Sequence, residues 1–434
     1  MSDLVFNQKL SILIKNTHIN QKTQDILINE GKILSIAPDQ NRNDAELIID
    51  GAKTLALPGL VNTHTHAAMS LLRGYADDMH LQEWLSDKIW PLEGHLTGDD
   101  VYIGTKLACL EMIRSGTTAF NDMYFFMDRA AQAVDEAGIR AKLSHGIITF
   151  GDPEKFSLEQ KATKELVTHV KQMNNSRITA AVAPHAPYTV PPDHMRWCAE
   201  FSAEEDIGLH IHVSETKSEV ESMLEMYGKR PAFLLDECGC LNERTVIAHG
   251  CWLDSDECAL IGKRGASVAY SPCSNMKLAT GRALPYDELK AAGVTVGLST
   301  DGASSNNNLD MFEEMKFASL YQKAFWGKDT VLPAHEVFNM ATKCGAKSMQ
   351  LTSGVLAPQT PADIILVSLS HPAMVPLYND VSNVVYAAHG GIVETVICDG
   401  ALLMHEHIIP GEAEILEKAR MTATDLVYRA SAPA

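Results

Sequence analysis

The tripeptide His64-Thr65-His66, which follows an apolar run from Ala56 to Asn62, most constrains what this chain can become. Alternate side chains of an extended segment point to the same side, so two histidines one residue apart can bind one metal ion together. Paired histidines also occur on half-exposed strands that bind no metal. The motif is therefore half of a candidate site, and the rest of the chain must supply the other half.

Three later segments have the same form, an apolar strand-like run that ends in a residue able to bind a metal or transfer a proton. The first run ends in His212 and Glu215, the second in His249 and the third in Asp301. Three neutral imidazoles and one carboxylate, with an open position for water, make a catalytic site for a divalent ion. The sequence thus predicts a catalytic metal centre.

Short apolar runs alternate with helical stretches between residues 58 and 355, which is typical of βα units and a parallel sheet. Eight strands are predicted, near residues 57–63, 117–121, 140–147, 179–184, 208–213, 245–248, 267–271 and 295–300. Eight such units predict an α/β fold, a (β/α)8 barrel of the TIM type, whose active sites lie at the C-terminal ends of the strands. The candidate ligands would all lie at that face.

The two ends of the chain, residues 1–57 and 356–434, have a different pattern. Strands are predicted at 10–14, 25–28 and 33–36 near the N-terminus, and at 362–367, 381–386 and 393–398 near the C-terminus, where Asp399-Gly400 supplies a hairpin-type turn. We expect both ends to pack together as one small discontinuous β-sandwich domain beside the barrel. A terminal helix is predicted from Ala413 to Tyr428.

Size and charge exclude several classes of protein. A chain of 434 residues exceeds the length at which one core stops growing, so a large and a small domain are expected. The net charge of −19 argues against a nucleic acid or an anionic membrane as a partner. No run approaches the roughly 20 apolar residues that span a bilayer. The start Met-Ser-Asp lacks the pattern of a secretory signal, which predicts a cytoplasmic protein.

The nine cysteines are scattered along the chain and odd in number, so they do not form the disulfide framework of a small secreted protein. Cys238 and Cys240 are the only close pair, and their spacing differs from that of redox or structural zinc sites. The zinc signature of cytidine deaminases, His-x-Glu followed by Pro-Cys-x-x-Cys, is absent from the sequence.

The segment from Pro58 to His66, taken with the later His, His and Asp, resembles the amidohydrolase superfamily. Five further segments resemble the 5′-methylthioadenosine/S-adenosylhomocysteine deaminases of that superfamily: Trp90-Pro91-Leu92-Glu93, Pro184-His185-Ala186-Pro187-Tyr188, His212-Val213-Ser214-Glu215, Ala248-His249-Gly250 and Ser299-Thr300-Asp301-Gly302-Ala303. The resemblance extends over nearly the whole chain. The metal motifs are specific for the superfamily, while Glu93 and His185 narrow the substrate.

The resemblance implies a single metal ion held by His64, His66, His212 and Asp301. Two-metal members of the superfamily use a bridging lysine at the end of strand 4, whereas that strand ends here in Pro184-His185. We expect zinc (Zn²⁺), with iron (Fe²⁺) as an alternative because His and carboxylate sites discriminate weakly between these ions.

The resemblance also implies zinc-dependent hydrolytic deamination of 5′-methylthioadenosine, adenosine or S-adenosylhomocysteine to the inosine analogue, with release of ammonia. Zinc-bound water would supply the nucleophile, Asp301 and His249 would take and orient its proton, and Glu215 would protonate the ring nitrogen. The resemblance further assigns Glu93 to the ribose hydroxyls and His185 to substrate contact. A homo-oligomer, a dimer or tetramer, is expected on the same basis.

Several alternatives stay open. Guanine, pterin and s-triazine hydrolases share the same metal motifs, and a non-catalytic structural relative of the same fold is a further alternative. Glu215 has a second interpretation as a first-turn helix carboxylate, and His249 as a core histidine. His210 receives no role.

The residues near strand 3 bear on whether a charged substrate can bind. Relatives that accept S-adenosylhomocysteine can hold its carboxylate with arginines near strand 3, but that strand ends here in Ser144-His145. Arg140 lies at the start of the strand, on the wrong side of the barrel. We therefore expect an uncharged nucleoside to be preferred.

Overall fold

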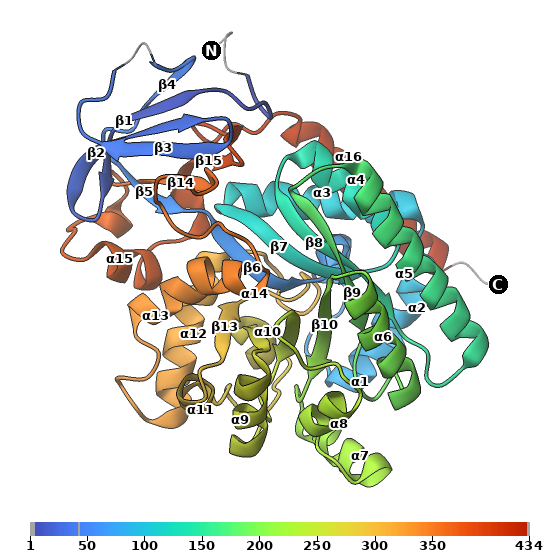
Figure 1. Cartoon of the computed structure of the whole chain (residues 1–434). Coiled ribbons are helices and arrows are strands. Elements are labelled where there is room, and N and C mark those ends of the chain that lie inside the picture. Colours follow the sequence, from blue (N-terminus) through green and yellow to red (C-terminus); the bar gives the residue numbers. More distant parts are fainter. Residues whose placement is uncertain (1–4, 42–43, 432–434) are drawn as a thin grey trace.

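Eight parallel strands form a barrel in the computed structural model, which describes residues 5–41 and 44–431 (Figure 1). The strands follow one another in sequence order around the sheet. They are β6 (Leu60–Thr65), β7 (Thr117–Tyr124), β8 (Arg140–Ile147), β9 (Ile178–Pro184), β10 (Gly208–Val213), β11 (Thr245–His249), β12 (Ser267–Tyr270) and β13 (Thr295–Leu298). The predicted (β/α)8 barrel is confirmed, although its first strand begins at Leu60 rather than at residue 57.

The barrel closes where β6 meets β13. The side-chain amide of Asn62 donates to Thr300 Oγ1 at 2.7 Å, and the Thr300 backbone N–H donates back to Asn62 Oδ1 at 3.0 Å. A Cβ at Gly297 would lie 2.5 Å from Thr63 Cγ2, so glycine is needed for the two strands to approach this closely. This closure places His64 and Asp301 side by side, with the Asp301 N–H donating to the His64 carbonyl at 3.0 Å.

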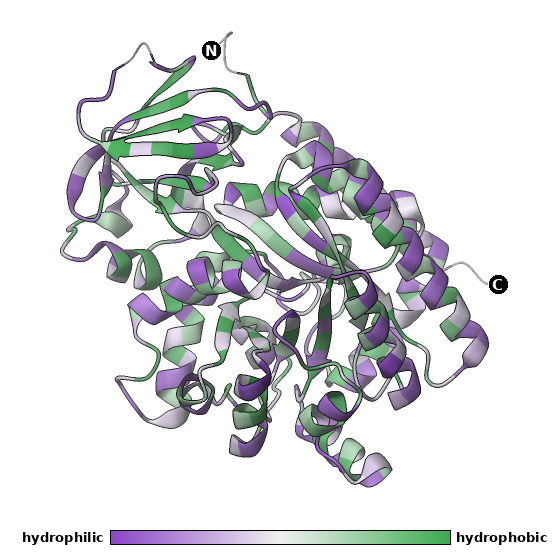
Figure 2. Cartoon of the chain, viewed as in Figure 1, coloured by the Kyte–Doolittle hydropathy of each residue, from purple (hydrophilic) through white to green (hydrophobic). Residues whose placement is uncertain are grey.

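Helices cover the outside of the barrel. In α5, the buried residues Thr163, Leu166, Val167 and Val170 follow the three-and-four spacing of an amphipathic helix, and Figure 2 shows hydrophilic and hydrophobic residues interleaved along the outer helices. The helices of the barrel are α3 (Gly98–Arg114), α4 (Met127–Ala137), α5 (Pro153–Met173), α6 (Pro192–Glu204), α7 (Lys217–Tyr227), α8 (Pro231–Glu237), α9 (Ser255–Arg264), α10 (Pro272–Lys277), α11 (Tyr286–Ala291), α12 (Met311–Trp326), α13 (Ala334–Asn339), η4 (Met340–Cys344) and α14 (Gly345–Ser348).

A chain of short helical segments follows β6 and leads to α3. These segments are η2 (Ala67–Leu72), α1 (Leu81–Trp84), η3 (Leu85–Ile89) and α2 (Trp90–Glu93). None of the described helices combines the length and the apolar character needed to cross a membrane. All nine cysteines lie among the described residues and are free, and all except Cys273 and Cys344 are buried.

The small domain is built from both ends of the chain, as predicted, and its described strands pair into one mixed sheet. Its strands are β1 (Ile12–Ile19), β2 (Lys22–Asn29), β3 (Lys32–Ala37), β4 (Leu47–Asp50), β5 (Thr54–Pro58), β14 (Ile364–Ser368), β15 (Val393–Cys398) and β16 (Ala401–Met404). The N-terminal and C-terminal parts join where β5 pairs antiparallel with β14, and Figure 1 shows the blue and orange strands side by side. The residue limits assigned to the domains from the sequence stay a prediction.

Both faces of the joining strands are buried. Ala56, Ile364 and Leu366 pack in the core of the small domain. Their neighbours in sequence, Leu55, Leu57, Ile365 and Val367, pack instead with the barrel core. This alternation follows from the period of two along a strand, and it fixes the small sheet against the barrel.

The strand predicted at residues 381–386 is wrong, because this segment is the helix α15 (Asp380–Tyr386). The side chain of Asn379 accepts the Ser382 N–H at 2.9 Å and so caps the helix. Val384 and Val385 are buried one turn after Val381, a spacing that suits a helix. The remaining short helices here are η5 (Pro372–Met374) and η6 (Gly390–Ile392).

The turn and the terminal helix predicted near the C-terminus are both present. The turn at Asp399-Gly400 joins β15 to β16, an antiparallel strand that was not predicted. The predicted terminal helix is α16 (Glu412–Ser431), which packs against α3 and the short segments before it.

Candidate active site

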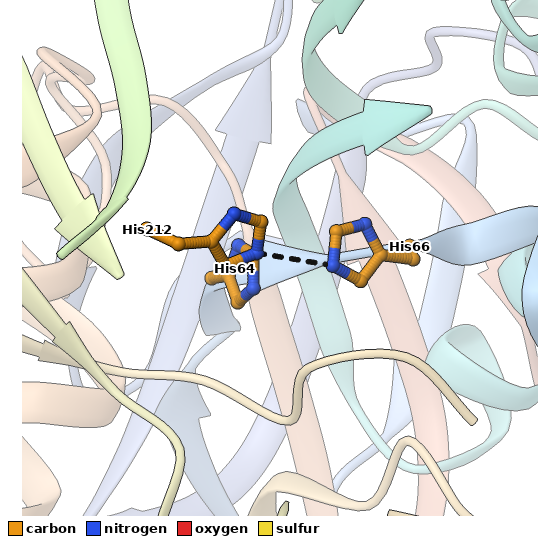
Figure 3. Close-up of side chains that lie close together, drawn as sticks. All are labelled: His64, His66 and His212. Atoms are coloured by element: carbon orange, nitrogen blue, oxygen red, sulfur yellow. Dashed lines mark hydrogen bonds between the residues drawn. The ribbon is translucent and has the colours of Figure 1, made fainter. Parts of the chain in front are cut away.

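The ends of three strands, β6, β10 and β13, bring the predicted ligands together at the C-terminal mouth of the barrel. The Nε2 atoms of His64 and His66 each lie 3.4 Å from Asp301 Oδ1. His212 Nε2 lies 3.3 Å from His66 Nε2, and Figure 3 shows the three imidazole rings facing one another. Ligand atoms of His64, His66 and His212 all lie within 4.8 Å of one another, and so do those of His64, His249 and Asp301.

The far side of each ligating ring is held by a hydrogen bond. His66 Nδ1 donates to the Met123 carbonyl at 2.6 Å, and His212 Nδ1 donates to the His185 carbonyl at 2.7 Å. A proton on Nδ1 leaves the Nε2 lone pair free, which is the tautomer that a metal ligand needs. His64 Nε2 is buried and has no hydrogen-bond partner among the described residues. The donor set therefore fits a divalent ion such as zinc.

Asp122 shapes the turn that carries the two N-terminal histidines. Its Oδ1 accepts from the Thr65 hydroxyl at 2.8 Å and from the Ala67 N–H at 2.7 Å. These bonds fix the chain directly after β6 and so direct His64 and His66 toward one point. No pattern in the sequence indicated a role for Asp122, which lies on the neighbouring strand β7.

Asp301 is held as a carboxylate by its surroundings. Its Oδ2 accepts from the hydroxyls of Ser274 at 2.6 Å and Ser305 at 3.0 Å, and its Oδ1 accepts the Gly302 N–H at 2.7 Å. Burial opposes ionisation, but the close imidazoles of His64, His66 and His249 hold the pKa of Asp301 well below its usual range. The site thus contains one permanent negative charge.

Glu215 and His249 lie beside this cluster. Burial raises the pKa of Glu215 to about 8, and the Asp301 charge adds to the effect. His249 Nε2 lies 3.8 Å from Glu215 Oε1, and burial lowers the pKa of His249 to about 4. The site therefore presents a protonated carboxyl group and a neutral imidazole at pH 7.

The carboxylate in the first turn of the following helix is Glu219 and not Glu215. Helix α7 starts after Thr216, and Glu219 accepts the N–H groups of Ser214 at 2.7 Å and Glu215 at 2.8 Å. The Glu215 side chain instead lines the cavity.

Glu93 and His185 line the same cavity from different elements. Glu93 ends α2, and its Oε1 is buried without a hydrogen-bond partner among the described residues. Burial raises the pKa of Glu93 to about 7, while the adjacent Tyr124 hydroxyl opposes the rise. Burial lowers the pKa of His185 to about 3, and its Nδ1 lies 3.0 Å from Thr189 Oγ1.

The remaining wall of the cavity is apolar. It is formed by Met69, Leu81, Trp84, Leu85, Trp90, Met123, Phe125, Ile148, Tyr188 and Leu278. Neither Lys nor Arg occurs among the described residues that line it. Arg140 is bonded far from the mouth, through Nε to Asp363 at 2.8 Å and through Nη2 to Asp399 at 2.8 Å, both on the small-domain side.

Two polar side chains behind the site were also missed. His210 Nε2 lies 2.9 Å from His64 Nδ1, and Asn275 Nδ2 lies 2.9 Å from His249 Nδ1. The signal for His210 was present, because residues two apart on a strand point to the same side and His212 is a candidate ligand. Asn275 lies in α10, and no pattern in the sequence relates it to β11.

The chain is similar to several curated deaminases. Relatives include a 5′-deoxyadenosine deaminase of Methanospirillum hungatei, 60% identical over 97% of this chain and 95% of the relative. A 5-methylthioadenosine/S-adenosylhomocysteine deaminase of Archaeoglobus fulgidus is 45% identical over 96% of this chain and 99% of the relative.

Solved structures with a similar fold include zinc-bound enzymes. An adenosine deaminase from Xanthomonas campestris with bound zinc superposes with a TM-score of 0.89 at 32% identity, over 96% of this chain and 99% of that chain. An atrazine chlorohydrolase from Arthrobacter aurescens has a TM-score of 0.85 at 22% identity, over 95% of this chain and 100% of that chain, and shares the fold. The model of the amidohydrolase family matches residues 55–403, and the chain belongs to that family.

Proposed function

We propose that this protein hydrolytically deaminates an adenine nucleoside with a small uncharged 5′ substituent, giving the inosine analogue and ammonia. The observation that supports this most directly is the placement of Glu215, a carboxyl group whose pKa of about 8 keeps it protonated, beside the His and Asp cluster in one cavity. Deaminase names among the relatives, including 5′-deoxyadenosine deaminase, support the same reaction class.

His64, His66, His212 and Asp301 would hold the metal ion. When bound, zinc would lower the pKa of water and so supply hydroxide near pH 7. We propose zinc rather than iron because a related adenosine deaminase was solved with zinc bound. Metal analysis of the purified protein tests this assignment, and iron with full activity would contradict it.

The residues of this chain would move the protons. Glu215 would donate its proton to the ring nitrogen next to the carbon that bears the exocyclic amine, which makes that carbon electrophilic. Asp301 and His249 would accept and orient the proton of the attacking water. The proton taken from water finally reaches the departing amine, and the proton of the new hydroxyl group returns to Glu215 as the carbonyl forms, so that one water and one aminopurine give one oxopurine and one ammonia.

The outer part of the cavity suits an uncharged nucleoside. Glu93, with a free buried oxygen, would accept hydrogen bonds from the two ribose hydroxyls. His185 would contact the substrate, and the wall with Trp84 and Trp90 would cover an apolar 5′ group. The α-carboxylate of S-adenosylhomocysteine would find no Arg or Lys among the described lining residues, so we propose that this substrate is disfavoured.

The experiment that tests this function is a parallel assay of ammonia release and ultraviolet change with zinc-loaded protein. The substrates are 5′-deoxyadenosine, 5′-methylthioadenosine, adenosine, S-adenosylhomocysteine, guanine and a chlorotriazine. We expect fast conversion of the first three. Turnover of guanine or the triazine alone would replace the nucleoside by a bare heterocycle, and equal turnover of S-adenosylhomocysteine would remove the proposed charge selectivity.

We also propose a homo-oligomer in the cytoplasm, as expected for this family. Light scattering coupled to size-exclusion chromatography tests the first part, and a monomer at micromolar concentration would contradict it.

A further inference from the structure

His210 lies directly behind His64, on the opposite edge of the ring from the metal-binding nitrogen. The two rings are nearly perpendicular, at 87°, with centroids 4.9 Å apart and with Nδ1 of His64 2.9 Å from Nε2 of His210. His210 is 1% exposed and lies two residues before His212 on β10, so both side chains point into the barrel. It does not line the cavity.

The other two imidazoles of the cluster are held differently. His66 and His212 donate from Nδ1 to backbone carbonyls, which no substitution can remove. His64 is held by a side chain. Among the three imidazoles, only the hydrogen bond that orients His64 can be removed by a single side-chain substitution.

The protons in this pair can be assigned. For His64 Nε2 to present a lone pair to a metal, the ring proton must be on Nδ1 and must be donated to His210 Nε2. His210 then has its own proton on Nδ1, which is buried without a hydrogen-bond partner among the described residues.

A side chain that only filled the barrel would need no polar atom here. Burying an N–H without a partner costs free energy that a hydrocarbon side chain of similar size avoids. Among the described residues, the one hydrogen bond of the His210 side chain is to a candidate metal ligand.

We propose that His210 is a positioning residue, which fixes the tautomer and the ring orientation of His64 for metal binding. The inference depends on the metal site of the proposed function and on no property of the substrate. A metal-binding experiment without substrate therefore separates its failure from failure of the proposed deaminase activity.

The test compares His210→Gln with His210→Asn and His210→Leu. Glutamine places an amide oxygen near the position of the imidazole Nε2, whereas asparagine is too short to reach His64 and leucine has no acceptor. His405→Gln is the matched control, because His405 contacts Thr395 in the small domain, away from the cluster. The dissociation constant for Zn²⁺ is measured by competition with a chromophoric chelator, after the folding of each metal-free variant is checked by thermal unfolding.

We expect the Asn and Leu variants to bind zinc about 10- to 100-fold more weakly, the range found when the outer hydrogen-bond partner of a ligand is lost. The Gln variant and the control should stay within about threefold of the unmodified protein, a range that lies below that loss. Wild-type affinity in the Asn and Leu variants would overturn the proposal, and so would a Gln variant as weak as Asn. If the Leu variant does not fold, the Gln and Asn pair decides the question.

Discussion

The proposed reaction requires that Glu215 carries a proton. Burial raises its pKa to about 8, so the side chain is an acid at neutral pH. Glu215→Gln keeps the shape and hydrogen-bond capacity of the side chain but removes the transferable proton. We expect kcat to fall by about 10²- to 10⁴-fold, the usual contribution of a general acid, with unchanged metal content.

Steady-state kinetics and metal analysis check this result together. Glu225→Gln is the matched control, since Glu225 is exposed on the following helix and should leave kcat unchanged. A Glu215→Gln variant with near-normal kcat would assign the proton transfer to another group.

The proposed role of Glu93 can be tested at the scale of one residue, because a carboxylate that binds ribose hydroxyls should matter for a nucleoside and not for a free base. Above its pKa of about 7, Glu93 is a charged acceptor, and at pH 8 Glu93→Gln removes a hydrogen bond that is worth about 1.5–3 kcal/mol. We expect KM for 5′-deoxyadenosine to rise about tenfold or more on that basis, with little change for free adenine. The exposed Glu83→Gln is the control. An equal loss for adenine and the nucleoside would favour the bare-ring alternative.

Candidate ligands that end apolar runs can be predicted from the sequence, whereas the side chains that hold those ligands in place cannot. His64, His212 and Asp301 each follow a run whose period is visible, and the barrel rule places their strand ends together. Asp122 and His210 lie within strands, and their partners come from other strands far away in the sequence. Only the assembled barrel shows these pairs.

At the scale of elements, the C-terminal helix α16 supports the segment that bears Glu93. Arg429 Nη2 lies 2.9 Å and 2.8 Å from the two oxygens of Asp100, and Nη1 donates to the His95 carbonyl. Asp100 also accepts the Thr97 N–H at 2.7 Å in the capping box of α3. Arg429 thus connects the last turn of the chain to the residues directly after Glu93.

Arg429→Ala should therefore weaken substrate binding more than chemistry. A loss of about 1 kcal/mol, typical for a hydrogen bond, corresponds to an increase of about fivefold in KM. We expect kcat to change less than KM, as measured by steady-state kinetics. Arg420→Ala is the control, because Arg420 pairs with Glu417 on the exposed face of the same helix. A fall in kcat alone would contradict this supporting role.

The error at α15 shows what limits prediction of short elements. The valines of Asp380–Tyr386 have high strand propensity, which favoured a strand. The cap from Asn379 and the burial of Val384 and Val385 on one face favour the helix instead. Six or seven residues are too few for the period to decide, whereas α5 and α16 are long enough to be recognised.

At the scale of the whole molecule, the barrel follows from the alternation of strands and helices, but the attachment of the small sheet does not. The joining pair β5 and β14 comes from opposite ends of the chain. Arg140, at the start of β8, pairs with Asp363 and Asp399 and so connects the barrel to that sheet. The sequence placed Arg140 away from the mouth, but its partners become visible only when both ends are assembled.

The many buried ionisable groups also give the whole molecule an unusual dependence on pH. Burial raises the pKa of four glutamates from an ordinary 4.5: Glu93 to about 7, and Glu215, Glu219 and Glu314 to about 8. Burial lowers the pKa of five histidines in the barrel from an ordinary 6.5: His64 and His249 to about 4, His185 to about 3, and His210 and His212 well below 6.5. The glutamates therefore lose their stabilising contribution as pH rises from 4.5 toward 8, and the histidines lose theirs as pH falls below 6.5.

The two sets oppose each other near and below pH 6.5, but the histidine contribution fades above it, and the four glutamates then outweigh the single Lys142, whose lowered pKa of about 8 acts in the opposite direction. We therefore expect the metal-free protein to lose stability between pH 6.5 and 8, where many proteins are most stable, with a fall in Tm of about 5 °C or more. Calorimetry of metal-stripped protein across this range measures the slope. Glu314 is bonded to Asn306 at 2.5 Å, outside the ligand cluster, so Glu314→Gln should reduce the slope without affecting metal binding. A constant or rising Tm from pH 6.5 to 8 would show that these carboxyl groups ionise freely in the folded protein.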